Sequence, residues 1–439
     1  MTTPNPRIFL YDEFSPEDLA MMQALYSRSS QSAEEHAKKV REVGSGKFMA
    51  QFYVGYGHKS IADCGSTTLF IEGVSMLAAK AVQDNPLYCG QETSSRYIDY
   101  AKQAIVDPLN TPISNTIMER WMSFYCSQME NVKAHLRVTC PRTEAEKEGM
   151  YERALAAWAF DIMRGFLPAG VTTQLSWHTN LRQAWDKLSQ MRWHPLPEIS
   201  NLAEELLQLL REKYQSSFCF ESTEVEDTYA KAMAEEHTYF VPKVIPEDMI
   251  FSTNISSEEL AQYQDTISSR PRKCMLPGSM RELGDVQYTY KIDFGSFRDL
   301  QRHRNGVCRM PLLTTEHGFS EWYLSQLPEG TRIMAEKLII EQKAMIDTLD
   351  CSLEIKQYYV AMGFNVWVRG TYGLPGLQYM IELRSGRTVH PTVRAVIHQM
   401  HHLLQAEFPQ LLLHSDLSPD DRDVRRGSQT IEVKEKVGV

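Results

Sequence analysis

The sequence predicts an α+β fold built from two similar halves, each with an antiparallel or mixed sheet and long helices. The first observation behind this prediction is repetition, because motifs of the first half recur in the same order in the second half. The second is a mixture of strand-like apolar runs and long stretches whose apolar residues recur every three or four positions. The third is size, since 439 residues, 43% of them hydrophobic, suffice for two or three domains.

Four pairs of segments carry the repeat. In chain order, the pairs are 8–20 with 250–261, 68–71 with 289–292, 117–118 with 333–334, and 192–195 with 387–391. Because all four matches occur in register, they favour duplication of one unit over chance similarity among amphipathic elements.

The same patterns predict helices and boundaries. Long helices with a 3.6-residue period are expected at 113–137, 147–166 and 198–214, and again at 329–350 and 391–408. Between the halves, the acidic stretch 221–248 contains two prolines and indicates a linker or connecting helix. We therefore predict a first repeat at 1–220, a linker at 221–248, a second and more diverged repeat at 249–415, and a charged, mobile tail at 416–439.

Charge and cysteine content exclude several classes of protein. The formal net charge of -10 argues against broad contact with nucleic acid or anionic lipid. No apolar run is long enough for a membrane span, and no secretory h-region begins the sequence. The 8 cysteines show no CxxC pair and no zinc-finger spacing, so we expect reduced thiols in a cytoplasmic protein. An anionic ligand would have to be held by local clusters of arginine.

The densest such cluster lies in the second half. Arg302, His303 and Arg304 form an RHR motif, with Arg298 and Arg309 nearby. Guanidinium groups hold phosphate or carboxylate oxygens in pairs, so this segment is a candidate oxyanion site. A solvated basic face or an ion-pair network at an interface is the alternative interpretation of the same residues.

The first half offers further candidates of a different kind. A loop with Ser94 and Arg96 presents hydroxyl and guanidinium donors, His58 precedes a strand-like run, and Arg164 ends a predicted helix. Asn180 and Arg182 follow in the segment SWHTNLR. The histidines at 398, 401 and 402 lie on one predicted helix without acidic or thiol partners, so no metal site is predicted.

In order and spacing, these motifs resemble one subunit of the flavin-dependent thymidylate synthases, a family with the signature RHR-x-x-S-x-N-E-x-S-x-R-Y. The first half matches through GHKSIAD, IEGVS, QETSSRY, MRGFLP, SWHTNLR and HPLPEISNLAEEL. The second half is more faintly similar through YTYKIDFGSFRDLQRHR and ELRSGRTVHP. The resemblance covers roughly residues 8–215 and 250–410.

The family signature is divided between the two halves. The first half has Asp84-Asn85-Pro86 in place of RHR. The rest of its signature stands, with Cys89 for the first Ser and Gln91 for Asn, followed by Glu92, Ser94, Arg96 and Tyr97. The second half keeps RHR and then has Val307, Met310, Leu312, Thr314 and Thr315 at the signature positions. This complementary retention favours composite sites over decay of both halves.

The resemblance implies a role for individual residues. Contacts to FAD fall to His58, Asn180, Arg182, Arg302, His303 and Arg304. Contacts to dUMP fall to Glu92, Ser94, Arg96 and Arg164. A further arginine for dUMP is expected on the helix after NxR, where Met191 stands; Arg192 follows it, and Arg384 is the nearest match in the second half.

The activity implied by the resemblance is FAD-dependent methylation of dUMP to dTMP, with 5,10-methylenetetrahydrofolate and NADPH as co-substrates. The flavin, and no catalytic side chain, would carry the reaction. Sites of this family form where subunits of a tetramer meet. We therefore expect a homodimer that acts as a pseudo-tetramer of repeats, with RHR from a second repeat and the S-x-R loop from a first.

Two alternatives stay open. Cys89 and Gln91 replace signature residues and would change the shape of the pocket. A related flavoenzyme that modifies another pyrimidine nucleotide, for example by hydroxymethylation, is therefore one alternative. A homologue that binds flavin or nucleotide without catalysis is the other.

Overall fold

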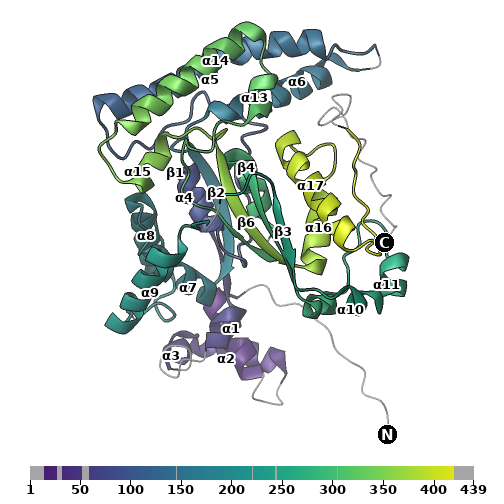
Figure 1. The fold of residues 1–439 in the computed structure, drawn as a ribbon. Helices are drawn as coiled ribbons and strands as arrows, with labels where there is room; N and C mark the ends of the chain where they lie inside the picture. The colour runs from purple at the N-terminus through teal and green to yellow at the C-terminus, as the bar shows by residue number, and fades with distance from the viewer. Residues whose placement is uncertain are drawn as a thin grey trace. The chain divides into compact units, whose positions relative to one another are not determined.

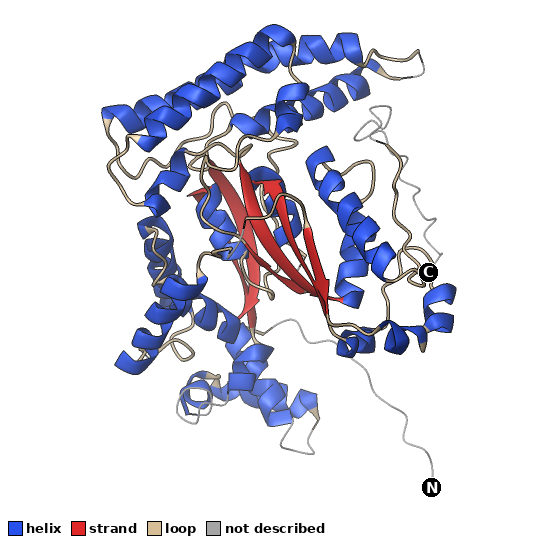
Figure 2. Cartoon of the chain, in the orientation of Figure 1, coloured by secondary structure: helices blue, strands red, loops and turns tan. Residues whose placement is uncertain are grey.

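The computed structural model describes residues 14–26, 32–51, 59–144, 146–219, 221–242, 245–303 and 305–419. It confirms an α+β fold with two antiparallel sheets (Figure 2). The chain packs into two compact units. Unit 1 comprises 1–71, 87–91 and 175–238, and unit 2 comprises 72–86, 92–174 and 239–439. Much of the first half of the sequence therefore packs with the second half, so these units do not follow the predicted boundaries at 220 and 249.

Unit 1 is mainly helical. Its elements are α1 (Pro16–Tyr26), α2 (Ala33–Val43), α3 (Gly46–Phe48), η2 (Lys59–Cys64), α7 (Leu181–Met191), α8 (Pro197–Lys213) and α9 (Glu224–His237). The apolar face of α7, with Leu181, Ala184 and Leu188 buried, packs against α8 because these residues recur at helical spacing. The predicted linker contains α9, which begins with a capping box formed by Thr223 and Glu226.

A two-stranded sheet pairs β1 (Ser66–Ser75) with β2 (Thr172–Asn180). Each strand runs directly into a helix. After β1 comes α4 (Met76–Gln83), whose first turn is capped by the Ser75 hydroxyl at 3.0 Å from the Ala78 nitrogen. After β2 comes α7, capped in the same way by Asn180.

The larger sheet belongs to unit 2. It has the order β3 (Ile250–Thr253), β4 (Asp285–Asp293), β6 (Asn365–Gly373) and β5 (Gly306–Arg309), and all neighbours are antiparallel. Alternate residues of β4, including Val286, Tyr288 and Tyr290, are buried. Their face is covered by α12 (Phe294–Gln301), α16 (Leu374–Arg384) and α17 (Pro391–Glu407) (Figure 1).

Two long helices of unit 2 lie side by side, as Figure 1 shows: α5 (Pro112–Thr139) and α14 (Glu329–Asp347). Buried amides join them. The Thr331 hydroxyl donates to Gln128 Oε1 at 3.0 Å, and Gln342 Nε2 donates to the Ile117 carbonyl at 2.7 Å. Next to α5 lies α6 (Glu148–Met163), followed by η3 (Arg164–Phe166). The five predicted long helices are thus confirmed, with ends that shift by up to three residues.

Short elements complete unit 2. They are α10 (Ser257–Ala261), α11 (Gln264–Ser269), η4 (Gly278–Leu283), α13 (Glu321–Ser325), α15 (Leu353–Lys356) and η5 (Gln357–Tyr359). With them, one order of elements occurs twice along the chain. The first series is η2, β1, α4, α5, α6, η3, β2, α7 and α8. The second is η4, β4, α12, α14, α15, η5, β6, α16 and α17, with β5 and α13 inserted between α12 and α14.

The first residues of the predicted tail are anchored in unit 2. The Asp416 N–H donates to Ser385 Oγ at 2.9 Å, and Arg394 donates to the Ser418 carbonyl at 2.8 Å. His398 donates to the Asp416 carbonyl at 3.0 Å. Asp416 and Ser418 thus have hydrogen-bond partners at the end of α16 and on α17, and the rest of the predicted tail, 420–439, lies outside the described residues.

Candidate functional site

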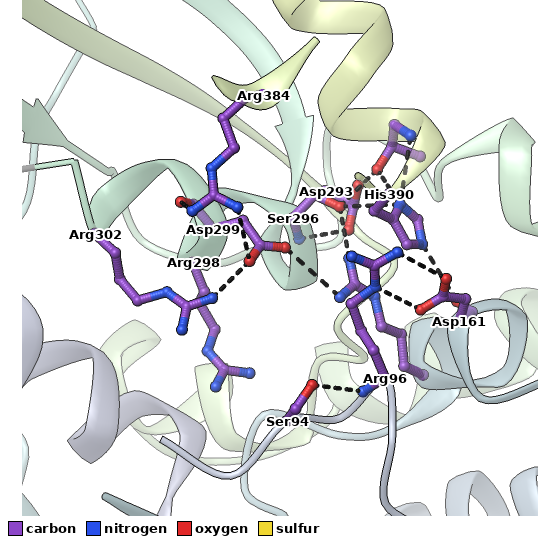
Figure 3. A network of polar contacts seen from close by, with 12 residues as sticks. Ser94, Arg96, Asp161, Asp293, Ser296, Arg298, Asp299, Arg302, Arg384 and His390 are labelled. Carbon is purple, nitrogen blue, oxygen red and sulfur yellow. Dashed lines mark hydrogen bonds and ion pairs between the residues drawn. The ribbon is translucent and has the colours of Figure 1, made fainter. Parts of the chain in front are cut away.

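Unit 2 contains a largely buried group of arginines and carboxylates, most of which Figure 3 shows. We call it the arginine network and define it by nine residues: Glu92, Arg96, Asp161, Arg164, Asp293, Arg298, Asp299, Arg302 and Arg384. Four of them come from the first half of the sequence and five from the second. The network therefore joins the arginine loop of one half to the RHR segment of the other.

Arg96 lies in the loop after α4 and makes a two-pronged ion pair with Asp161 of α6. Its Nε and Nη2 donate to the two carboxylate oxygens at 2.7 and 2.9 Å. Nη2 also approaches the Thr388 carbonyl at 3.4 Å. Burial raises the pKa of Asp161, and this effect outweighs the attraction of Arg96 and Arg164.

Arg164 begins η3 and is only 2% exposed. Its Nη2 donates to Ser296 Oγ at 2.8 Å, and its Nε lies 3.4 Å from the Tyr323 hydroxyl. Tyr323 in turn donates to Asp293 Oδ1 at 2.8 Å. Although burial alone would lower it, the pKa of Arg164 is raised by Tyr323, Asp299 and the other carboxyl groups. Arg164 is therefore a fixed positive charge.

Asp299 is the centre of the network. Its Oδ1 lies 2.6 Å from Arg302 and 4.0 Å from Arg384, and its Oδ2 lies 3.9 Å from Arg164. Burial raises the pKa of Asp299, but the surrounding arginines outweigh burial and lower it overall. Asp299 and Arg302 are three residues apart at the end of α12, so the helix places them on one face.

Two neutral histidines border the network. Arg384 Nε donates to His303 Nε2 at 2.7 Å, so this nitrogen carries no proton. Burial and the nearby Arg384 lower the pKa of His303 to about 3. At the start of α17, His390 Nε2 lies 3.4 Å from the Asp161 carbonyl, while Nδ1 accepts from the Thr392 N–H at 3.4 Å. Burial, Arg164 and Arg96 lower the pKa of His390 well below its usual value.

Glu92 is held from two sides. It forms an ion pair with Arg298, and its Oε2 accepts a hydrogen bond from Gln83 Nε2 at 2.6 Å. Ser94 Oγ accepts from the Arg96 N–H at 3.3 Å and thereby shapes the loop. The predicted dUMP-binding residues Glu92, Ser94, Arg96 and Arg164 therefore lie in or beside the network.

Other predicted residues lie in unit 1 with different partners. Asn180 Oδ1 caps α7 by accepting from the Gln183 N–H at 2.8 Å. Arg182 pairs with Asp63 at 2.7 Å and with Asp186 at 3.3 Å. Arg192 pairs with Glu204 at 2.5 Å. Of the two arginines considered for the helix after NxR, only Arg384 belongs to the arginine network.

Two predicted residues, His58 and Arg304, lie outside the described residues. Sequence reasoning also missed several members of the site, namely Asp161, Asp293, Ser296, Asp299, Tyr323 and His390. A usable signal existed for two of them, because Asp161 and Asp299 each precede an arginine by one helical turn. The others come together only through the fold.

The sequence of the first half matches a known family. A family model described as "Thymidylate synthase complementing protein", or Thy1, matches residues 10–214. Residues 10–214 form a Thy1 domain. This Thy1 domain supplies Glu92, Arg96, Asp161 and Arg164, whereas the other members of the arginine network lie beyond its end.

Relatives of the chain extend past the Thy1 domain. A UPF0159 protein of Chlamydia pneumoniae is 24% identical over 401 residues, covering 78% of this chain and 75% of the relative. One from Thermoplasma acidophilum is 21% identical over 474 residues, covering 88% of this chain and 93% of the relative. These UPF0159 proteins are of unknown function. The similarity therefore includes the second half, which completes the network.

Two further findings concern the described part of the chain. None of its helices combines the length and apolar character that a membrane crossing requires. Its histidine, cysteine and carboxylate side chains form no group of three that could hold a metal ion.

Proposed function

We propose that the protein catalyses FAD-dependent methylation of dUMP to dTMP, with 5,10-methylenetetrahydrofolate as carbon donor and NADPH as reductant. The Thy1 domain supports this reaction class. The observation that carries the proposal is the arginine network, because Arg164 of the Thy1 domain surrounds Asp299 together with Arg302 and Arg384 of the second half. Arg96 of the Thy1 domain also reaches the second half, at the Thr388 carbonyl.

The proposed nucleotide site is the arginine network itself. Its five arginines face four carboxylates, and the bordering His303 and His390 are neutral. A phosphate group can replace an aspartate as the partner of a guanidinium, since both present oxygens to the same pair of N–H donors. Arg302, whose side chain is 38% exposed, lies at the edge of this site and is assigned to the flavin.

We also propose that the two series of elements are tandem repeats. Segments 165–170 and 358–363 pair antiparallel through four backbone bonds of 2.7–2.9 Å. These run from Gly363 to Gly165, from Met362 to Leu167, from Ala169 to Val360 and from Gly170 to Tyr358. The bond from Gly363 to Gly165 corresponds to the bond from Gly170 to Tyr358, and the other two bonds correspond to each other in the same way. Such reciprocal bonds are the pattern of a local two-fold axis.

Glycines at equivalent positions support the same relation. A Cβ on Gly170 would lie 2.6 Å from the Val106 carbonyl oxygen, and one on Gly363 would lie 2.9 Å from the Gly165 carbonyl oxygen. Both segments thus require close backbone approach. The buried glutamines of α5 and α14 fit the same axis, because Gln128 of α5 bonds to Thr331 of α14 and Gln342 of α14 bonds to Ile117 of α5. A homodimer would then present four repeats, like a tetramer of single subunits.

The residues available for FAD fit its binding. Asn180 uses Oδ1 in capping α7, which leaves its Nδ2 group as a donor, and Asp299 is the ion-pair partner of Arg302 among the residues that the structure describes. His303 is neutral and uses Nε2 as an acceptor. Of the predicted flavin contacts, Arg302 and His303 lie together in unit 2 and would hold the flavin. When bound, FAD supplies the hydride chemistry.

The chain's own groups would orient the nucleotide and stabilise charge. Arg96 and Arg164 are fixed by Asp161 and Ser296, so they are preorganised to favour negative charge on a bound pyrimidine or its phosphate. Fixed donors of this kind act strongly in a buried setting because no reorganisation is needed.

The test combines flavin binding with turnover. Purified protein is titrated with FAD and followed by its visible absorbance, and tritium release from C5-labelled dUMP is then measured with NADPH and methylenetetrahydrofolate. Flavin uptake with tritium release is expected. Flavin uptake without release would redirect the proposal to another pyrimidine nucleotide, and absence of flavin uptake would overturn it.

A further inference from the structure

The proposed repeat defines a second position equivalent to the one built around Arg164. The pairing of 165–170 with 358–363 makes Gln357 the counterpart of Arg164. By the same spacing, Glu354 is the counterpart of Asp161. The second position therefore has a neutral amide where the arginine network has its most buried guanidinium.

The loop of the second half differs in the same direction. In the first half, the Ser176 N–H donates to the Gln91 carbonyl. In the second half, the counterpart of Ser176 is Arg369 on β6, which lies opposite Arg309 on β5. Arg309 is therefore the counterpart of Gln91. Counting on from this pair, Met310 stands in place of Glu92 and Thr314 in place of Arg96. The second position has thus lost both arginines that the first half contributes to the arginine network.

The chain itself fills this second position. Gln357 Nε2 donates to the Tyr239 hydroxyl at 2.9 Å, and the Phe240 N–H donates to the Met310 carbonyl at 3.0 Å. Gln357 Oε1 meanwhile accepts from the Leu313 N–H at 2.9 Å. Phe240 is only 7% exposed. Tyr239 and Phe240 follow α9 directly, so the connecting segment between the repeats supplies both rings.

The guanidinium groups of two arginines contact the Phe240 ring. The guanidinium carbons of Arg369 and Arg309 lie 4.4 and 5.7 Å from its centroid. These arginines are directly opposed on β6 and β5, an arrangement of like charges that costs stability. Burial and Arg309 lower the pKa of Arg369 accordingly. The aromatic face of Phe240 offsets this repulsion and thereby fixes the segment in place.

We propose that Tyr239 and Phe240 close the second position, so that each chain binds one nucleotide, at the arginine network. The Phe240 ring stacks on guanidinium groups, and the Tyr239 hydroxyl bonds to the Gln357 amide. A nucleotide base could otherwise make contacts of both kinds. The count of one nucleotide rests on the proposed function, whereas the closure rests on the contacts of Tyr239 and Phe240 alone.

Hydrogen exchange of the free protein tests the closure without any nucleotide. The Phe240 amide is expected to exchange at least about tenfold more slowly than its intrinsic rate, because Met310 accepts its hydrogen bond within a packed segment. Phe240→Ala should accelerate exchange at Leu313, and Tyr229→Ala should leave it unchanged, since Tyr229 is 67% exposed on α9. Exchange of Phe240 at the intrinsic rate would overturn the closure.

Calorimetric titration with dUMP tests the count. One dUMP per chain is expected for the unmodified protein and for Tyr229→Ala. Two dUMP per chain would overturn the proposal. If no dUMP binds, the proposed function fails while the exchange measurement still decides the closure.

Discussion

At the scale of residues, the neighbouring groups distinguish Arg384 from Arg192, although both follow similar sequence motifs. Arg384 lies within the arginine network, with Nε on His303 and Nη2 on the Asp299 carbonyl at 3.0 Å. Arg192 instead makes an ion pair in unit 1 with Glu204, whose side chain is 50% exposed. The sequence pattern admitted both as ligands of the nucleotide, because spacing along a helix does not reveal which acidic groups surround its end.

Arg384→Ala should weaken dUMP binding by at least about tenfold, because one guanidinium of the proposed phosphate site is lost. Calorimetric titration measures this change. Arg192→Ala is the matched control and should leave the affinity within about twofold, since exposed ion pairs contribute little. Equal losses in the two variants would contradict the placement of the nucleotide at the arginine network.

At the scale of elements, the helices were predictable and their partners were not. The 3.6-residue period of apolar residues predicted α5, α8, α14 and α17 because that period is a property of each segment alone. The pairing of α5 with α14 depends on buried amides from distant parts of the sequence, such as Gln128 and Gln342. A single glutamine in a helical pattern carries no sign of such a partner.

Gln342→Ala should destabilise the protein by about 2–3 kcal/mol, since it removes a fully buried side chain and its bond to the Ile117 carbonyl. Urea unfolding followed by circular dichroism measures the change. Lys337→Ala on the exposed face of α14 serves as control, with a change expected within about 0.5 kcal/mol. A neutral Gln342→Ala would argue against this packing of α5 and α14.

The helix ends that carry His303 and His390 predict a dependence of stability on pH. Both pKa values are lowered in the folded state, to about 3 for His303, so the folded protein binds fewer protons than the unfolded chain below pH 6.5. Stability is therefore fully present above the unfolded pKa of about 6.5 and is lost as pH falls toward 3. At pH 5.5 His303 should cost about 1.4 kcal/mol, and His390 acts in the same direction.

Comparison of the unmodified protein with His390→Gln isolates this effect. The loss of unfolding free energy between pH 7.5 and 5.5 should be smaller in His390→Gln, by up to about 1.4 kcal/mol. Urea unfolding at the two pH values gives both losses. Identical losses would mean that His390 is not held neutral by its buried position between Arg164 and Arg96.

At the scale of the whole molecule, the two halves of the sequence contribute to one buried network within unit 2. The repeated motifs and the divided signature predicted that the halves complement each other, because Arg96 and Arg302 survive in different halves. The carboxylates that hold these arginines, above all Asp161 and Asp299, were not predicted. Their role depends on burial and on neighbours from both halves, and neither is encoded in a local pattern.

In the proposed function, one chain supplies the whole nucleotide site. Chains with Arg96→Ala and chains with Arg384→Ala are co-expressed under different affinity tags, and mixed dimers are purified on both tags. Because both arginines belong to unit 2 of a single chain, every site in such a dimer lacks one of them, and no dUMP-dependent tritium release is expected. Recovery of about half the activity of unmodified dimers would contradict the claim, because it requires sites that cross between chains.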